Sequence, residues 1–409
     1  MFKVIIFILF FFNINYANDS LKTYSDEIAN ALSLIERYYP GDVNREDLTN
    51  AAINGMLGSL DPYGKIFSKE NFKSYTQPIS ESKYAGLGIV VKYDDKLKNV
   101  VVVSVMNKSP AQKSGIVNGD RIIKIDGVDV STISFEEISN RIRGKIGEKV
   151  FLIVRKKYND KEQQYSIKRE NIEINNVKSY LYEDICYISL NVDFNSKSPK
   201  HIRDVMSNYA SQGNKINGII LDLRGNPGGE LDAAKSIANY FINSGVMFKI
   251  KTKVLGNKNK YLENDILIDK NVAKAPNVPL VVLINEGSAS ASELLSASIK
   301  DNKRGVLVGE KSFGKGIGQG FISTGINQKV MKLTTFEFLS PKGNVLHKSG
   351  VMPDIVVKNK KLSKKKAKKI FDSNQKENLS EHEKLLSFDK QYVAAFDIMR
   401  SLIVIKNLK

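Results

Sequence analysis

Residues 172–357 alternate between short apolar runs and helical patterns, and this alternation limits the possible folds more than any other feature. The runs are apolar throughout, which is typical of strands buried on both faces of a sheet. Strands that alternate with helices favour an α/β core with a largely parallel sheet. The apolar runs are 185–190, 218–223, 280–285 and 306–309, and helical segments include 231–242 and 290–300.

The composition excludes several kinds of site. The chain has 409 residues with one Cys and three His, and it contains no HExxH pattern. One Cys cannot form an internal disulfide or a multi-Cys metal centre, and scattered His residues do not predict a His-rich site. We therefore expect neither a metal ion nor a cofactor.

The charge is strongly positive, with 62 Lys and Arg against 44 Asp and Glu, or +18. Such an excess first suggests nucleic acid or an anionic membrane as a partner. However, eight of the Lys residues lie in the segment KNKKLSKKKAKK at 358–369, which contains no acid. A solvated basic segment is the simplest interpretation, with contact to a membrane surface as the alternative. No nucleic-acid-binding motif accompanies it, so we expect no nucleic acid partner.

The amino terminus has the pattern of a signal peptide over residues 1–17. Lys3 precedes an apolar run, 4–12, that is too short to span a bilayer as a helix. Ala17 is a plausible cleavage position, but Asn15 is large for the position two residues before it, so an uncleaved anchor stays open. A buried amino-terminal strand is a third interpretation. We expect export to the periplasm or to the outer face of the inner membrane.

Helical regions are predicted on both sides of the α/β core and of the domain that precedes it. Apolar residues recur at helical spacing in 18–75, with a joining stretch at 75–83 before the next domain. The segment 255–276 is polar and predicts an irregular surface excursion. After the core, 358–378 predicts a basic linker and 379–409 one terminal helix.

Residues 84–169 predict a small β domain with two helices and resemble a PDZ domain. The resemblance is carried by Gly86, Leu87, Gly88 and Ile89, followed by SPAQKSGIVNGDRIIKIDGVDV at 109–130. Backbone N–H groups of the Gly-Leu-Gly turn can cradle a terminal carboxylate, and the next strand offers an edge to a peptide. A generic β-sandwich with glycine turns is the alternative.

Three segments of the core could carry chemistry. LDLRGNPGG at 221–229 follows a strand, and its last two glycines, Gly228 and Gly229, allow close approach of a ligand at a helix start. A plain β–α turn is the alternative. In INEGSASASE at 284–293, Ser288, Ser290 and Ser292 compete as nucleophile, and helix capping is the alternative role. In GEKSFGKGIGQ at 309–319, Lys315 is the natural base to seek, because no Ser–His pair is evident; a solvated loop lysine is the alternative.

Together these segments resemble the C-terminal processing peptidases, also called tail-specific proteases. The resemblance covers nearly the whole chain after residue 24. Its motifs are AAINGMLGSLDPY (51–63), the PDZ block, LDLRGNPGG, INEGSASASE, the 301–304 segment, GEKSFGKGIGQ and LSPKGN…GVMPDI (339–355). The resemblance implies a ClpP/crotonase-like α/β protease core with an inserted PDZ domain and helical ends.

The family's catalytic residues fall on Ser290 as nucleophile, Lys315 as general base and Gln319, which orients the lysine. For the oxyanion, backbone N–H groups of Ala291 and of either Gly228 or Gly229 are the candidates. Two departures are Tyr63-Gly64 in place of the family's usual His-Ser, and Cys186 in place of a common Gly, and we expect neither to touch the chemistry. Glu293 and Asp301 also match family positions, and we expect structural roles for them.

Together with the amino-terminal pattern, the resemblance implies an exported serine endopeptidase that takes proteins with apolar C-terminal tails and processes or degrades envelope proteins. Arg143 matches a position that couples the PDZ domain to the core in relatives, which also form dimers through terminal helical regions. One rival is a non-enzymatic envelope scaffold, and a second is acyl-CoA chemistry on a crotonase-like core. The intact Ser–Lys pair weighs against the first, and together with the PDZ block it weighs against the second.

Overall fold

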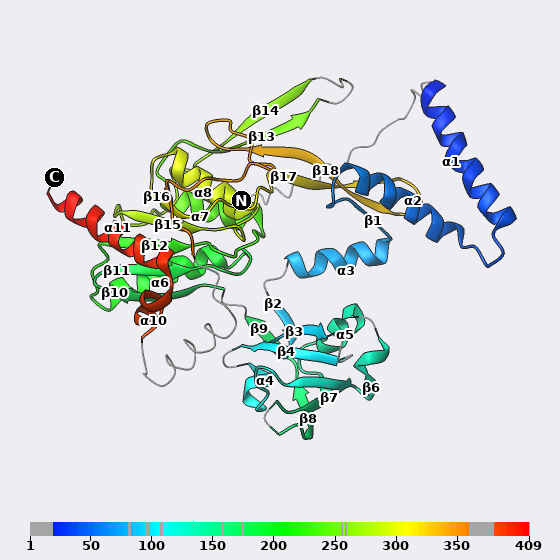
Figure 1. Ribbon diagram of the computed structural model, residues 1–409, viewed down its shortest axis with the longest axis horizontal. Coiled ribbons are helices and arrows are strands. Elements are labelled where there is room, and N and C mark those ends of the chain that lie inside the picture. Colours follow the sequence, from blue (N-terminus) through cyan, green and yellow to red (C-terminus); the bar gives the residue numbers. More distant parts are fainter. Residues whose placement is uncertain are drawn as a thin grey trace. The chain divides into compact units, whose positions relative to one another are not determined.

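The computed structural model describes residues 19–80, 83–94, 99–106, 109–133, 135–157, 159–173, 176–254, 257, 260–359 and 380–408. The chain divides into two compact units, Pro78–Asn175 and the combination of Met1–Gln77 with Asn176–Lys409 (Figure 1). The predicted signal peptide (1–17) and most of the predicted basic linker (358–378) lie outside the described residues. Within the described part, no helix is both long and apolar enough to span a bilayer.

The smaller unit is an antiparallel β domain. Five strands pair in the order β3-β4-β5-β7-β8, β6 pairs with β5, and β2 pairs with β9 in a separate ribbon. Alternate residues of β7 point inward, so Val150, Leu152 and Val154 meet Leu87 and Ile138 in one core. The elements are β2 (Lys83–Gly86), β3 (Ile89–Asp94), β4 (Asn99–Val105), α4 (Pro110–Lys113), β5 (Arg121–Ile125), β6 (Val128–Asp129), α5 (Phe135–Ile142), β7 (Lys149–Arg155), β8 (Glu162–Lys168) and β9 (Glu170–Glu173).

The larger unit is built on a six-stranded sheet of order β10-β11-β12-β15-β16-β19, in which every pair except β10–β11 is parallel. This confirms the predicted α/β core interrupted by a β-rich domain. The elements are β10 (Lys178–Tyr182), β11 (Ile185–Ser189), α6 (Ser198–Ser211), β12 (Gly218–Asp222), α7 (Leu231–Phe241), β15 (Leu280–Ile284), α8 (Ala291–Asp301), β16 (Val306–Gly309) and β19 (Ile355–Val356).

Both faces of this sheet are covered, which explains the continuous apolar runs. Ile219 and Leu221 of β12 pack with α7 and α8, whereas Ile220 between them packs against helix α11 (Lys390–Asn407). All five residues of β12 are buried, and the same holds for β11 and β15. The carboxyl ends of β12, β15 and β16 therefore open into three neighbouring turns at one edge of the sheet.

A second sheet of the larger unit is antiparallel, with order β1-β18-β13-β14 and β17 paired to β18. Its strand β14 corrects the prediction of an irregular excursion at 255–276. Six of the seven side chains of β14 are exposed, so this edge strand carries no alternation of apolar and polar residues. The strands are β1 (Lys65–Phe67), β13 (Val246–Lys253), β14 (Tyr261–Leu267), β17 (Ile317–Ser323) and β18 (Val330–Leu339).

Helices form both ends of the described chain. At the amino-terminal end, α1 (Asp19–Tyr38) and α2 (Arg45–Leu60) precede β1, and α3 (Lys69–Ser80) follows it. At the other end the structure has two helices, α10 (Glu381–Phe388) and α11 (Lys390–Asn407), where the sequence predicted one. The break falls at Asp389, whose side chain accepts a hydrogen bond from the backbone N–H of Tyr392 and so starts α11 as its cap.

Candidate active site

Ser290 lies at the junction between β15 and α8, immediately before the first helical residue. Its backbone has φ 55° and ψ −116°, in a region that residues with a side chain seldom occupy. Its N–H donates to Oε2 of Glu293 at 2.8 Å, which ties the strained residue to the first turn of the helix. The half-buried Ser290 side chain is therefore presented at a helix amino terminus, where backbone N–H groups favour negative charge.

The two competing serines are engaged elsewhere. The hydroxyl of Ser288 donates to the carbonyl of Leu223 at 2.8 Å, and that of Ser292 donates to the carbonyl of Asn226 at 3.0 Å. Both side chains are completely buried, so neither can reach a substrate without rearrangement. Their bonds hold the 223–229 turn against the serine segment, and Ser290 is left as the candidate nucleophile.

Glu293 joins the serine segment to the lysine loop. Its buried carboxylate accepts four hydrogen bonds, with Oε2 receiving the N–H groups of Ser290 and Lys315, each at 2.8 Å. Oε1 receives the hydroxyl of Ser312 at 2.6 Å and the N–H of Gly314 at 2.7 Å. The backbone nitrogens of Ser290 and Lys315 therefore lie no further apart than twice 2.8 Å. A match to family motifs identified Glu293 as structural, but its position between the two candidate catalytic residues depends on the tertiary fold.

Lys315 lies in the turn between β16 and β17, and its side chain is half-buried. Its Nζ lies 4.5 Å from the centre of the Tyr63 ring, which comes from the turn after α2. Burial lowers the pKa of Lys315 from its ordinary value, the charge of Lys332 lowers it further, and Asp61 opposes both. Such a shift favours the neutral amine that a general base requires.

Gln319 lies on β17, and its side-chain amide nitrogen donates to the hydroxyl of Thr334 on β18 at 3.0 Å. Among the described residues, no hydrogen bond joins the side chain of Lys315 to that of Ser290 or Gln319. The structure therefore brings Ser290 and Lys315 together through their backbones, and the orienting role of Gln319 stays a prediction.

Gly228 lies directly against the candidate nucleophile. A side chain at this position would lie 2.9 Å from the Cβ of Ser290 and 3.0 Å from the nitrogen of Ala291, and its φ is +104°. Its N–H donates to Oδ1 of the buried Asn226 at 2.8 Å, so Asn226 shapes the turn from within. Gly229 likewise packs on the backbone of Phe194 with φ +132°. Only glycine fits this approach, which puts the turn beside the amino terminus of α8.

A buried charge cluster holds the same turn from the other side. Arg224 forms ion pairs with Asp222, with 2.6 Å between Nη2 and Oδ2, and with Asp389 at the start of α11, at 2.7 Å. Gln391 accepts from Arg224 at 3.0 Å and donates to Glu310 of the lysine loop at 3.0 Å. The start of α11 is thus bonded both to the turn that carries Arg224 and to the lysine loop, and sequence spacing offers no signal for these contacts.

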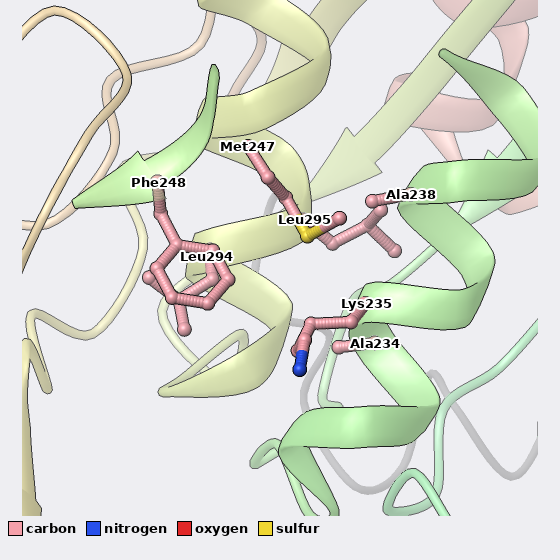
Figure 2. Close-up of a pocket in the computed structure, with 7 residues that line it drawn as sticks. All are labelled: Ala234, Lys235, Ala238, Met247, Phe248, Leu294 and Leu295. Atoms are coloured by element: carbon pink, nitrogen blue, oxygen red, sulfur yellow. The ribbon is translucent and has the colours of Figure 1, made fainter. Parts of the chain in front are cut away.

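Figure 2 shows an apolar pocket lined by side chains of α7, α8 and β13. It lies between α7, α8 and β13, with Lys235 as its only charged neighbour, and is lined by Ala234, Lys235, Ala238, Met247, Phe248, Leu294 and Leu295. All of its apolar lining residues are buried, so it is a packing seam beneath the first turns of α8. Within the described residues, no group of three or more His, Cys, Asp and Glu side chains is arranged to hold a metal ion.

In the smaller unit, the four residues of the expected carboxylate cradle, Gly86, Leu87, Gly88 and Ile89, connect β2 to β3. Gly88 has φ +71° and packs so closely on Ser109 that a side chain there would clash. In the described part of its sheet, β3 pairs with β4 alone and is therefore an edge strand. This is the arrangement that peptide addition requires.

Comparison with known proteins supports these assignments of fold. Residues 184–357 match peptidase family S41, and residues 77–155 match the PDZ domain. The carboxy-terminal-processing protease of Bartonella bacilliformis is 35% identical over 318 residues, which cover 76% of this chain and 70% of the relative. The carboxy-terminal processing protease CtpB of Bacillus subtilis is 31% identical over 338 residues, covering 81% and 68%.

The solved structure of a photosystem II D1 C-terminal processing protease matches 81% of this chain and 92% of its own, at 25% identity and a TM-score of 0.49. The PDZ match includes Gly86, Leu87, Gly88 and Ile89, and the S41 match includes Gly228, Gly229, Ser290, Ala291, Lys315 and Gln319, whereas Tyr63 lies outside both. The chain belongs to peptidase family S41, as a serine-type carboxy-terminal processing protease with a PDZ domain.

Proposed function

We propose that this protease cleaves peptide bonds with Ser290 as the nucleophile and Lys315 as the general base. The observation that carries the proposal is the Glu293 carboxylate, which binds the backbone N–H groups of both residues at 2.8 Å. A lysine with an ordinary pKa near 10.4 is charged at neutral pH and cannot accept a proton. The lowered pKa of Lys315 supports its role as a base.

In the proposed reaction, the Ser290 hydroxyl loses its proton to the neutral Nζ of Lys315 as its oxygen bonds to the substrate carbonyl carbon. The peptide C–N bond then breaks, and the leaving amine takes the proton from Lys315. Water, deprotonated by Lys315, attacks the resulting ester, and Ser290 recovers its proton. Backbone N–H groups of Ala291 and of a glycine in the 228–229 turn would stabilise the oxyanion, each worth about 10²–10³ in rate. Gln319 would orient the amine.

The test is cleavage of an unstructured protein with an apolar tail by Ser290→Ala and Lys315→Ala. We expect both variants to fold and to lose cleavage. Ser296→Ala is the matched control, because its hydroxyl is also on α8 but is buried and bonded to the carbonyl of Ser292 at 2.7 Å. Full activity in Lys315→Ala would refute the dyad.

We further propose that the PDZ domain binds the apolar C-terminal tail of the substrate, with the N–H groups around Leu87 and Gly88 receiving its carboxylate. The edge position of β3 supports this. A substrate with an amidated C-terminus should then show a raised KM with little change in cleavage of a tail-independent peptide. Equal KM values for the acid and the amide would contradict it.

Export and processing of envelope proteins are proposed from the amino-terminal pattern at 1–17. Mass spectrometry of the amino terminus separates cleavage after Ala17 from a retained anchor. Comparison of C-termini of envelope proteins in cells with the active enzyme and with Ser290→Ala would identify substrates.

Two further contacts are proposed for the terminal regions. The lysine segment 358–369 would bind anionic lipid headgroups, to be tested with anionic vesicles and Lys→Gln replacements. The terminal helices would form a homodimer, which the exposed apolar side chains of Tyr24 and Ile28 on α1 support.

A further inference from the structure

The side chain of Lys315 is directed toward an aromatic ring. Its Nζ lies 4.5 Å from the centre of the Tyr63 ring, well within the distance at which a ring face attracts a cation. In the part of the chain that the structure describes, this Nζ makes no hydrogen bond to Ser290 or Gln319. The observed conformation is thus one in which the base is held by the ring and is not yet bonded to the nucleophile.

The turn that carries the Tyr63 ring is anchored by hydrogen bonds of its backbone N–H groups. The N–H of Tyr63 donates to Oδ1 of Asp61 at 2.8 Å, and the N–H of Asp61 donates to the carbonyl of Leu57 at 3.3 Å, which closes α2. Two residues later, Lys65 pairs with Lys332 of β18, so the turn is joined to the sheet that also carries β17. The backbone of Tyr63 is therefore anchored to α2 and to the sheet, and Lys315 has the longer side chain of the two.

The attraction between a ring face and a lysine exists only while the lysine is charged, because it arises from the ring quadrupole acting on the cation. A neutral amine gains nothing from it and is free to make hydrogen bonds. The backbone of Lys315 is held beside that of Ser290 by Glu293, so the two side chains leave the main chain from neighbouring positions.

We propose that Tyr63 is a positioning residue that holds the protonated side chain of Lys315 apart from Ser290 and releases it when Lys315 loses its proton. This inference rests on the proposed role of Lys315 as the base and adds a control on that role.

Other charged groups around Lys315 also act on its pKa. Asp61 favours its charged form, and Lys332, which also donates to the hydroxyl of Tyr75 at 2.8 Å, disfavours it. The carboxylate of Glu293 is occupied by backbone N–H groups, and Glu337 of β18 pairs with Lys251 at 3.8 Å. The backbone of His347 and Lys348 packs on Gly314 and Gly316 beside the lysine, and Lys65 lies opposite Lys332.

The experiment is the pH dependence of kcat/KM for the full chain with Tyr63→Leu and Tyr63→Phe. Loss of the ring removes a stabilisation of the cation, so the acid limb for Tyr63→Leu should move to lower pH by about 0.5–1.5 units. Well below the midpoint, that shift raises kcat/KM by about 3–30-fold. Tyr63→Phe keeps the ring face and should keep the wild-type midpoint.

A second measurement does not depend on activity. In Ser290→Ala protein, the rate at which Lys315 reacts with acetic anhydride is followed against pH by mass spectrometry, with and without Tyr63→Leu. The midpoint should fall by the same amount. Tyr261→Leu is the matched control, because the Tyr261 ring makes the same kind of contact with another lysine: the Nζ of Lys251 lies 4.9 Å from its centre on the β13–β14 hairpin. This variant should leave the labelling midpoint of Lys315 unchanged.

If Tyr63→Leu does not fold, trifluorophenylalanine at position 63 keeps the shape of a phenylalanine ring while weakening its quadrupole, and the same downward shift is expected. An unchanged labelling midpoint in either variant would overturn the inference. If Lys315→Ala retains full cleavage while the labelling midpoint still shifts, the contact stands but the proposed dyad fails, so the two failures are distinguishable.

Discussion

Replacement of Glu293 by Gln tests whether this buried carboxylate holds the two candidate catalytic segments together. A carboxylate accepts at both oxygens, and each oxygen here receives two donors. Gln offers one oxygen and one NH₂ group. The Gln side chain has the lower energy with its NH₂ group at the Oε1 position. There the hydroxyl of Ser312 can rotate and accept a hydrogen bond from the NH₂ group, whereas the N–H of Gly314 can only donate. Gln would then keep the bonds to Ser290 and Lys315 but leave one buried N–H unpaired.

The expected loss of stability follows from the number of hydrogen bonds that Gln cannot replace. One unpaired buried N–H, together with the loss of charge from the remaining bonds, should reduce the free energy of unfolding by about 2–5 kcal/mol. A shift of the lysine loop by about 1 Å should lower kcat by up to roughly 10²-fold, and KM should change little, because the buried Glu293 does not face substrate.

Urea unfolding followed by circular dichroism gives the stability, and steady-state cleavage separates kcat from KM. Ser296→Ala is the control, since it removes one buried neutral hydrogen bond from the same helix and should cost about 1 kcal/mol without lowering kcat. The reasoning is refuted if Glu293→Gln unfolds at the wild-type urea concentration. A large loss of stability with normal kcat would make Glu293 a structural residue only.

Three further predictions concern the surroundings of the site. Asp389→Asn keeps a capping side chain for α11 but removes one of the two carboxylates on Arg224, so it should lower the free energy of unfolding at pH 7 by about 2–3 kcal/mol. Burial alone would raise the pKa of Asp389, but its hydrogen bond and ion pair with Arg224 outweigh burial and lower that pKa. The stabilisation is therefore present above about pH 4 and is lost as the pH falls through the folded pKa. The urea midpoints of the wild type and the variant should converge in acid. Gly228→Ala places a methyl group against Ser290 and Ala291, and it should lower kcat/KM by at least about 10²-fold; wild-type kinetics would show that the turn is not in contact with the nucleophile. Burial lowers the pKa of His382, which is bonded to the hydroxyl of Tyr392 at 2.6 Å, so the unfolded state binds its proton first and stability should fall as the pH drops below about 6.5. His382→Phe should remove that part of the pH dependence between pH 7.5 and 5.5, and an unchanged dependence would exclude His382 as its source.

The strands of the core could be predicted because burial on both faces leaves a direct mark on the sequence. The runs at 218–223 and 280–285 are apolar without interruption and became β12 and β15. By contrast, β14 gave no signal, because its side chains are exposed and its strand pairing with β13 uses the backbone. The break between α10 and α11 was also missed, since Asp389 owes its place to Arg224, far away in the sequence.

The candidate site divides in the same way. Ser290, Lys315 and Gln319 were predicted from motifs that are continuous in sequence. The family resemblance already selected Ser290 among the three serines, and the contacts of Ser288 and Ser292 in the fold supply a physical reason for that choice. Glu293 could be placed in a motif but not between two catalytic turns. Tyr63 was expected to take no part in the chemistry, yet its ring lies 4.5 Å from the Nζ of Lys315. Its turn reaches the lysine through contacts such as the β1–β18 pairing, which spacing along the sequence does not reveal.

The bonds between Arg224 and Asp389 have a consequence for the order in which the protein matures during synthesis. The turn that holds Gly228 and Gly229 cannot obtain its full set of partners until α11 has left the ribosome, because Asp389 and Gln391 follow Arg224 by 165 and 167 residues. Contacts between residues so distant in sequence form late in folding. A nascent protease is therefore incomplete until the start of α11 has emerged, and chains stalled before residue 389 should not cleave their neighbours.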